Sequence, residues 1–235
     1  MPKRSNGRIL QMAIGQKGDL IISGHGKSGG GSFERVIING HGVIHGDITA
    51  RVVVINGISK MHASVYAEEM EINGHSKNEG RVTFRKMEIN GKASFLNSIE
   101  GKELQLNGMV KIEGDCEVEN AELNGGFTIE GLLNADTIAI SLSGRSTVKE
   151  IGGETISVKR DKQSFLQLDK LFSILNKELT ADMIEGDVIE LENTIAKTVR
   201  GKHVHIGPGC QIDLVEYRED IRISEEADVK KSVKI

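Results

Sequence analysis

The fold is decided by one stretch, residues 36–60, which reads VIINGHGVIHGDITARVVVINGISK. An Ile-Asn-Gly triplet stands in it at 38–40 and again at 55–57, and an [Ile/Leu]-Asn-Gly triplet returns at 72–74, 89–91, 106–108 and 123–125. The triplets keep the same 17-residue period at every step, without an insertion or deletion. A fixed period of this length indicates a solenoid in which each repeat forms one structural coil.

Apolar residues alternate with exchangeable ones inside each repeat, which is typical of strands with one buried face. One repeat is too short to hold two helices, so we predict parallel strands stacked coil on coil around a thin core. The expected inward residues are Val36/Ile38, Val53/Ile55, Met70/Ile72, Met87/Ile89, Leu104/Leu106 and Ala121/Leu123 in one strand, Ile48/Ala50, Val65/Ala67, Val82/Phe84, Ile99/Gly101, Cys116/Val118 and Leu133/Ala135 in a second, and Ile44, Met61, Phe95, Ile112 and Ile129 in a third.

The asparagines of the triplets recur at one corner of every coil. Asparagine tolerates the left-handed backbone region, and stacked side-chain amides can hydrogen bond from coil to coil. We therefore predict a structural ladder, and we expect the glycine after each asparagine to relieve the steric limit of a sharp turn. The ladder residues are Asn39, Asn56, Asn73, Asn90, Asn107 and Asn124.

The regular series breaks after Val158. Residues 164–179, SFLQLDKLFSILNKEL, place apolar side chains on one helical face and predict an amphipathic α-helix that interrupts the solenoid. Whether this helix docks on the solenoid or binds a partner or a membrane is left open. The expected organisation is a flexible N-terminal tail (1–18), a β-helix (19–158), a helical insert (159–180), C-terminal β-helix coils (181–223) and a flexible tail (224–235).

The composition argues against several classes of function. The formal net charge of −4 is spread over 30 basic and 34 acidic residues, so no basic field predicts a nucleic-acid partner. The N-terminal residues have no apolar signal region, and no stretch is long and apolar enough to span a membrane. We expect a cytoplasmic protein that at most contacts the inner face of the membrane. Cys116 and Cys210 are expected to be buried small hydrophobic residues, without a disulfide or a metal.

Several patterns are candidates for binding sites. The run Gly24–Ser28 ends like a phosphate-binding loop, but Ile21 stands where that motif needs glycine. His45 and His62 lie one repeat apart with Glu79 next in their column, which indicates either a solvated surface ladder or a metal site. The pair His203 and His205 lacks an obvious third ligand.

The sequence carries no signature of catalysis, so we predict neither a catalytic site nor a bound cofactor. A Gly-x-Ser-x-Gly motif is missing, and neither cysteine has a histidine near it in the sequence. Four acids lie close together in one coil, at Glu113, Asp115, Glu117 and Glu119, and charged outward positions on a strand are ordinarily a solvated face.

The 17-residue [Ile/Leu]-Asn-Gly coils, with Ile-Glu-Gly or Ile-His-Gly corners between them, resemble the bactofilin family of polymer-forming bacterial cytoskeletal proteins. Residues 184–217, IEGDVIELENTIAKTVRGKHVHIGPGCQIDLVEY, are similar to the C-terminal part of the longer bactofilin-like proteins of Gram-positive bacteria. The resemblance implies a right-handed β-helix that assembles end to end without nucleotide and positions client proteins in the cell. This chain departs from the usual layout, because its solenoid is longer, is interrupted and is poor in proline.

The residues themselves also favour self-association, since a β-helix ends in strands whose backbone groups have no next coil to pair with. Two alternatives stay open. One is a β-helix acyltransferase that uses His41, His45 or His75, although that class is built on 18-residue coils. The other is a regulatory domain that binds another cytoskeletal polymer through one face.

Overall fold

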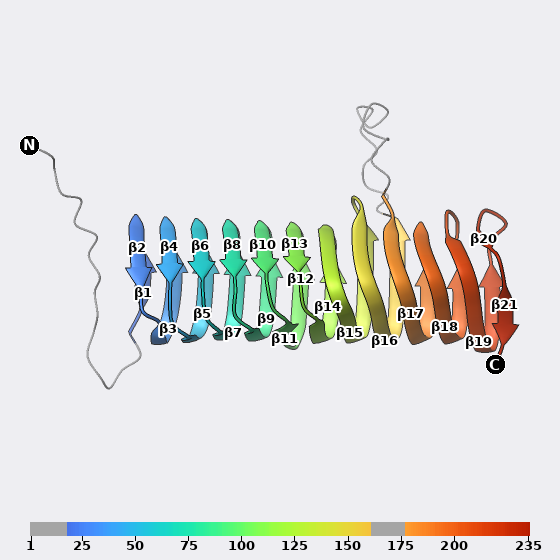
Figure 1. Cartoon of the computed structure of the whole chain (residues 1–235), viewed down its shortest axis with the longest axis horizontal. Coiled ribbons are helices and arrows are strands. Elements are labelled where there is room, and N and C mark those ends of the chain that lie inside the picture. Colours follow the sequence, from blue (N-terminus) through green and yellow to red (C-terminus); the bar gives the residue numbers. More distant parts are fainter. Residues whose placement is uncertain (1–17, 161–176) are drawn as a thin grey trace, which may run out of the picture.

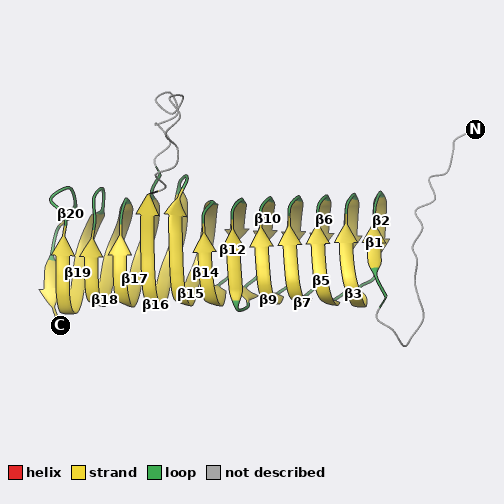
Figure 2. Cartoon of the chain, turned by 180° about the vertical axis from the view of Figure 1, so that it is seen from behind, coloured by secondary structure: helices red, strands yellow, loops and turns green. Residues whose placement is uncertain are grey.

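The computed structural model describes residues 18–160 and 177–235, and every regular element in them is a β-strand. The strands stack coil on coil along one axis, with the first described coil at one end of a rod and the last at the other (Figures 1 and 2). Strands of successive coils pair in parallel throughout, as β4 with β6 and β5 with β7. The predicted all-β parallel β-helix is therefore confirmed.

In the N-terminal half a coil consists of a short strand and a longer, bent one. The short strand β4 (His41–Ile44) pairs with β6 (Ile58–Met61), which lies one repeat later in the chain. The bent strand β5 (Ile48–Ile55) pairs with β7 (Val65–Ile72) through both of its halves. The other strands of this half are β1 (Leu20–Ile22), β2 (His25–Ser28), β3 (Gly31–Ile38), β8 (His75–Asn78), β9 (Val82–Ile89), β10 (Lys92–Phe95), β11 (Ile99–Glu100), β12 (Glu103–Leu106), β13 (Met109–Ile112) and β14 (Cys116–Leu123).

In the C-terminal half one long strand runs around most of each coil, and the coil length varies. The long strands are β15 (Gly126–Leu142), β16 (Ser146–Arg160), β17 (Leu179–Leu191), β18 (Thr194–Ile206) and β19 (Gln211–Ile223). Ile129 pairs with Val148, which is a longer step than the period of the N-terminal half, whereas Leu179 pairs with Thr194, which is a shorter one. The Asn-Gly corner is lost here together with the fixed period.

Strands β16 and β17 pair in register although residues 161–176 separate them in the sequence. The stacking of the solenoid is therefore continuous from β16 to β17. Most of the predicted helix 164–179 lies outside the described residues. Two residues at each end of the expected range 159–180 belong to β16 and β17, because their backbones pair in register with a neighbouring coil.

The expectation of a flexible tail over 224–235 does not hold for its strand residues. β20 (Asp228–Val229) and β21 (Ser232–Lys234) both pair with β19 and complete a last coil. The sequence did not indicate this coil, because its outward and end-facing residues are mostly polar and charged. Parallel pairing only requires backbone groups and a few apolar contacts, which Ala227 and Val229 supply.

The core is a thin column of aliphatic side chains that runs the length of the rod. Every residue expected to face inward is buried except Gly101, which is half-buried. Phe95 is the largest of the fully buried side chains. Since each coil contacts only its neighbours, stability comes from coil boundaries added one after another.

Candidate assembly surfaces

The six corner asparagines stand in one column and hydrogen bond from coil to coil. Asn56 Nδ2 donates to Asn39 Oδ1 at 2.9 Å, and the same bond recurs at each step up to Asn124. The next three bonds are 3.0 Å long and the last, from Asn124 to Asn107, is 3.4 Å. The amides also bind acids of their own coils, as when Asn90 donates to Glu88 Oε1 at 2.9 Å. The ladder thus links successive coils of the rod through side chains that solvent reaches.

Glycine is required after each asparagine for a different reason from the one predicted. Neither the ladder asparagines nor the glycines that follow them have a positive φ; in the described chain only Gly30, Gly31, Asn193 and Gly209 do. The requirement is close approach: a Cβ on Gly57 would lie 2.0 Å from the carbonyl oxygen of Gly40 in the coil before it. The same clash recurs up the column, so the corner backbones stack too closely for any side chain.

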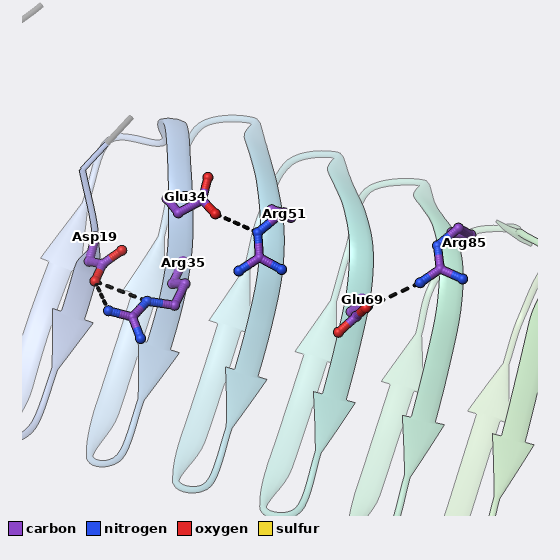
Figure 3. A network of polar contacts seen from close by, with 6 residues as sticks. All are labelled: Asp19, Glu34, Arg35, Arg51, Glu69 and Arg85. Atoms are coloured by element: carbon purple, nitrogen blue, oxygen red, sulfur yellow. Dashed lines mark hydrogen bonds and ion pairs between the residues drawn. The ribbon is translucent and has the colours of Figure 1, made fainter. Parts of the chain in front are cut away.

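A second ladder, made of ion pairs, lines the corner where the longer strands bend (Figure 3). Arg35 pairs with Asp19, Arg51 with Glu34, and Arg85 with Glu69 at 3.1 Å, each linking two successive coils. The hydrogen bond from Arg35 holds the pKa of Asp19 below its usual value. The sequence reasoning missed this ladder, although the opposite charges of Glu34 and Arg51, one period apart, could have revealed one of its pairs. Exposed pairs of this kind contribute little to stability.

The histidine columns are brought together as stacks and not as a three-ligand cluster. The His45 and His62 rings stack with centroids 5.1 Å apart, and His62 Nδ1 lies 2.6 Å from Glu79 Oε2. This hydrogen bond, followed by one from Lys60, lowers the pKa of Glu79. Within residues 18–160 and 177–235 no group of three or more metal-ligating side chains is arranged to hold an ion.

The other candidate residues are not gathered into one site. His41 stacks on His25 at 5.5 Å in a different column from His45, and His75 lies two coils further on. His203 pairs with Asp220 and Glu219, and the hydrogen bond that its ring donates to the Asp220 carboxylate raises the pKa of His203. His205 lies 3.8 Å from Glu190. The run Gly24–Ser28 contains strand β2 and no helix start.

The four clustered acids also have separate roles. Glu113 pairs with Lys111, and Glu119 pairs with Lys102 at 2.6 Å. Asp115 Oδ1 accepts the backbone N–H of Leu132 at 2.8 Å, which ties two coils together. Glu117 points outward from β14.

One polar cluster lies inside the core, and the sequence reasoning did not find it. The Ser59 and Ser76 hydroxyls are 2.8 Å apart, and Asn78 Nδ2 donates to Ser76 Oγ at 3.0 Å. Asn78 is fully buried between Met61 and Phe95 of the neighbouring coils, and its Oδ1 has no hydrogen-bond partner. An unpaired buried oxygen costs stability, so this coil boundary is a weak point of the rod.

Both cysteines are buried and unpaired. Burial raises the pKa of the Cys116 thiol to about 12 and that of Cys210 to about 11. A thiol that stays protonated and inaccessible is a poor nucleophile, so neither residue is a candidate for catalysis.

The two ends of the rod differ in chemistry. Among the described residues, β1 and β2 pair only toward the C-terminal side, with β3 and β4, and the inward residues there include Leu20, Ile22 and Phe33. At the other end β20 and β21 pair only with β19. Lys234 stands in the inward column there, since it pairs with the core-packed Tyr217. Within residues 18–160 and 177–235, the strands at both ends of the rod therefore have one edge without a paired strand, and the N-terminal end is the more apolar.

No helical segment among the described residues has the length and apolar character needed to cross a membrane.

Comparison with known proteins finds similarity in the first part of the chain. Residues 6–100 match the family model described as "Bactofilin: Polymer-forming cytoskeletal", which confirms the predicted resemblance. Two proteins of Bacillus subtilis (strain 168), both named as uncharacterized, are similar over 105 residues: YhbE is 50% identical and YhbF 46%. The aligned segment is 44% of this chain and 43% and 42% of theirs, so the chain spans less than half the length of these curated relatives. No solved structure matches the chain.

Proposed function

We propose that this chain, whose residues 6–100 match the bactofilin model of polymer-forming cytoskeletal proteins, is a non-enzymatic scaffold whose rods join end to end. The observation that carries the proposal is the strand edge at each end of the rod, which has no partner among the described residues. Unpaired backbone N–H and C=O groups on a strand edge are a template for another chain. Joining requires only backbone pairing and apolar contact, and for that reason we propose that it needs no nucleotide.

The two ends contribute unequally to such a polymer. At the N-terminal end Leu20, Ile22 and Phe33 close the core with apolar side chains, so a junction there buries hydrocarbon surface. At the C-terminal end Lys234 occupies an inward column and its ammonium group donates to the Glu219 carbonyl oxygen at 3.3 Å, so a junction there has to take this charge out of water. We propose that the N-terminal end forms the tighter junction.

We further propose that the polymer lies in the cytoplasm and positions client proteins along its outward faces. The buried, unpaired thiols of Cys116 and Cys210 fit a reducing compartment. The outward columns repeat at every coil, so a client that recognises one coil meets the same geometry again along the rod.

Electron microscopy and light scattering of the purified full chain, with and without nucleotide, test this function. We expect filaments or large oligomers under both conditions. The variant Phe33→Arg places a charge in the end-facing core and should shift the distribution toward single rods. Ser32→Arg, on the outward side of the same strand, is the matched control and should leave assembly intact. A protein that is monomeric across concentration and salt would count against the proposal.

A further inference from the structure

The ladder asparagines share a chemical liability, because a glycine follows each of them. The glycine nitrogen can attack the side-chain Cγ of the asparagine, so that a new N–Cγ bond closes a succinimide ring. The Cγ–Nδ2 bond breaks, and ammonia leaves with the proton that the glycine nitrogen gives up. Water then opens the ring at one of its two carbonyls and yields aspartate or isoaspartate. The only co-reactant is water.

In five of the six steps the structure restrains the attacking nitrogen. The glycine N–H donates to a carbonyl oxygen of the preceding coil, and a nitrogen held in this way is neither free to rotate nor easily deprotonated. These bonds are Gly40 to Ile22 at 3.1 Å, Gly57 to Ile38, Gly74 to Ile55 and Gly91 to Ile72 at 2.9 Å, and Gly108 to Ile89 at 3.0 Å.

The amide under attack is restrained as well. An asparagine inside the ladder, such as Asn90, donates through Nδ2 to the coil before and accepts through Oδ1 from the coil after. Its side chain is therefore fixed on both sides, and departure of the amide nitrogen would break the chain of bonds.

The last step of the ladder lacks these restraints. Among the described residues, the N–H of Gly125 makes no backbone hydrogen bond, although its neighbour Asn124 donates to Leu106 at 2.7 Å. The side-chain bond from Asn124 to Asn107 is the longest in the ladder, at 3.4 Å. In the next described coil Ser141 takes the corner position, directly after Ile140, and it does not hydrogen bond to Asn124. The coil also changes here, because strand β15 runs from Gly126 to Leu142 without a break, whereas the strand after the previous corner, β13, ends at Ile112.

We propose that Asn124–Gly125 is a site of spontaneous deamidation in the folded protein, and that the other five Asn-Gly steps are protected by their coil-to-coil hydrogen bonds. The product places a carboxylate where an amide now donates to Glu122 Oε1 at 3.1 Å. One donor is lost and two like charges face each other, which weakens this boundary between the regular and the irregular half of the rod. The isoaspartate product also adds a backbone atom beside Gly125, where even a Cβ would lie 1.9 Å from Gly108 O.

Peptide mass spectrometry tests the proposal, with five controls inside the same chain. Each ladder asparagine falls in its own tryptic peptide, because a lysine or arginine separates every neighbouring pair. The folded full chain is incubated at physiological temperature and slightly alkaline pH, digested quickly at acidic to neutral pH, and the conversion is assigned to a residue by fragmentation. We expect Asn124 to convert about tenfold faster than the other five, the factor that one lost hydrogen bond of ordinary strength gives.

Two further experiments distinguish the effect of the fold on the deamidation rate from the effect of the local Asn-Gly sequence. In denaturant the six rates should converge, since every site then has only its Asn-Gly sequence. The variant Ser141→Asn extends the ladder by one amide and should slow conversion at Asn124 severalfold, whereas Ser141→Ala should not. Equal rates in the folded chain would overturn the proposal, and so would an Asn124 excess that persists unchanged in denaturant or in Ser141→Asn.

Discussion

Replacing Gly74 with alanine separates close backbone approach from backbone conformation as the reason for glycine at the ladder corner. Gly74 has no positive φ, so alanine can adopt its backbone angles. Its Cβ, however, would lie 2.0 Å from Gly57 O and 2.7 Å from Asn56 O, both backbone atoms of the coil before. Backbone in a paired sheet cannot turn aside as a side chain can, so the two coils must separate.

The cost follows from the bonds at this corner. Bringing the Cβ to 3.0 Å from the nearest oxygen requires a local shift of about 1 Å, which stretches the bonds from Gly74 N to Ile55 O (2.9 Å) and from His75 N to Gly57 O (2.8 Å). Two hydrogen bonds at about 1 kcal/mol each, together with about 1–3 kcal/mol of overpacking, give a loss of about 3–5 kcal/mol.

Urea unfolding followed by circular dichroism measures this loss, with Gly24→Ala as the matched control. Gly24 also lies at a ladder-type corner, but its Cβ would meet nothing within 4 Å. The control should be neutral or more stable by about 0.4–1 kcal/mol. Because solenoids can unfold in parts, midpoints are compared first and hydrogen exchange then locates the weakened coil. A Gly74→Ala loss below about 1 kcal/mol, or one equal to that of the control, would refute the reasoning.

Four further outcomes are expected. Asn90→Ala breaks the ladder on both sides and should cost about 1–2 kcal/mol in urea unfolding, with faster hydrogen exchange at that corner; unchanged exchange would contradict it. Asn78→Met removes the unpaired buried oxygen and should raise stability by about 1–3 kcal/mol, so a lower midpoint would speak against it. The thiols of Cys116 and Cys210 should react with a thiol reagent only after denaturation, and rapid labelling of the folded chain would contradict their burial. Because the pKa of Glu79 is lowered, its contribution is present above its unfolded-state pKa of about 4.3 and lost as the pH falls through its folded value; the midpoints of wild type and Glu79→Gln should therefore converge in acid.

The sequence predicted those features that repeat chemistry in every coil. The periodic triplets and the apolar columns were sufficient for the fold and the core, because every coil meets the same packing requirement. The predicted reason for the corner glycines, a sharp turn, was wrong. An Asn-Gly pair is the same in sequence whether the backbone turns sharply there or only stacks closely on the next coil. Asn78 was missed because one polar residue in an otherwise apolar column looks like an exception at the surface, and only the folded chain places it between Met61 and Phe95.

The ends and the exposed columns were harder to predict. β20 and β21 are short and charged, so composition indicated a tail where backbone pairing forms a coil. The ion-pair ladder at Asp19, Arg35 and Arg51 depends on how exposed side chains reach across coils, a property that strand periodicity does not encode. A contact between surface charges does not alter the pattern of apolar residues in a sequence.

The stacking of strands across the rod axis has a mechanical consequence. The hydrogen bonds between coils run along the rod, so tension on its two ends loads all the bonds of a boundary at the same time. Such a joint resists pulling with the combined strength of its bonds and then gives way as a unit, at whichever boundary is weakest. A tensile break is therefore expected first at the coil that carries the unpaired amide oxygen of Asn78, and a filament of such rods under load would fail at a defined position in each subunit.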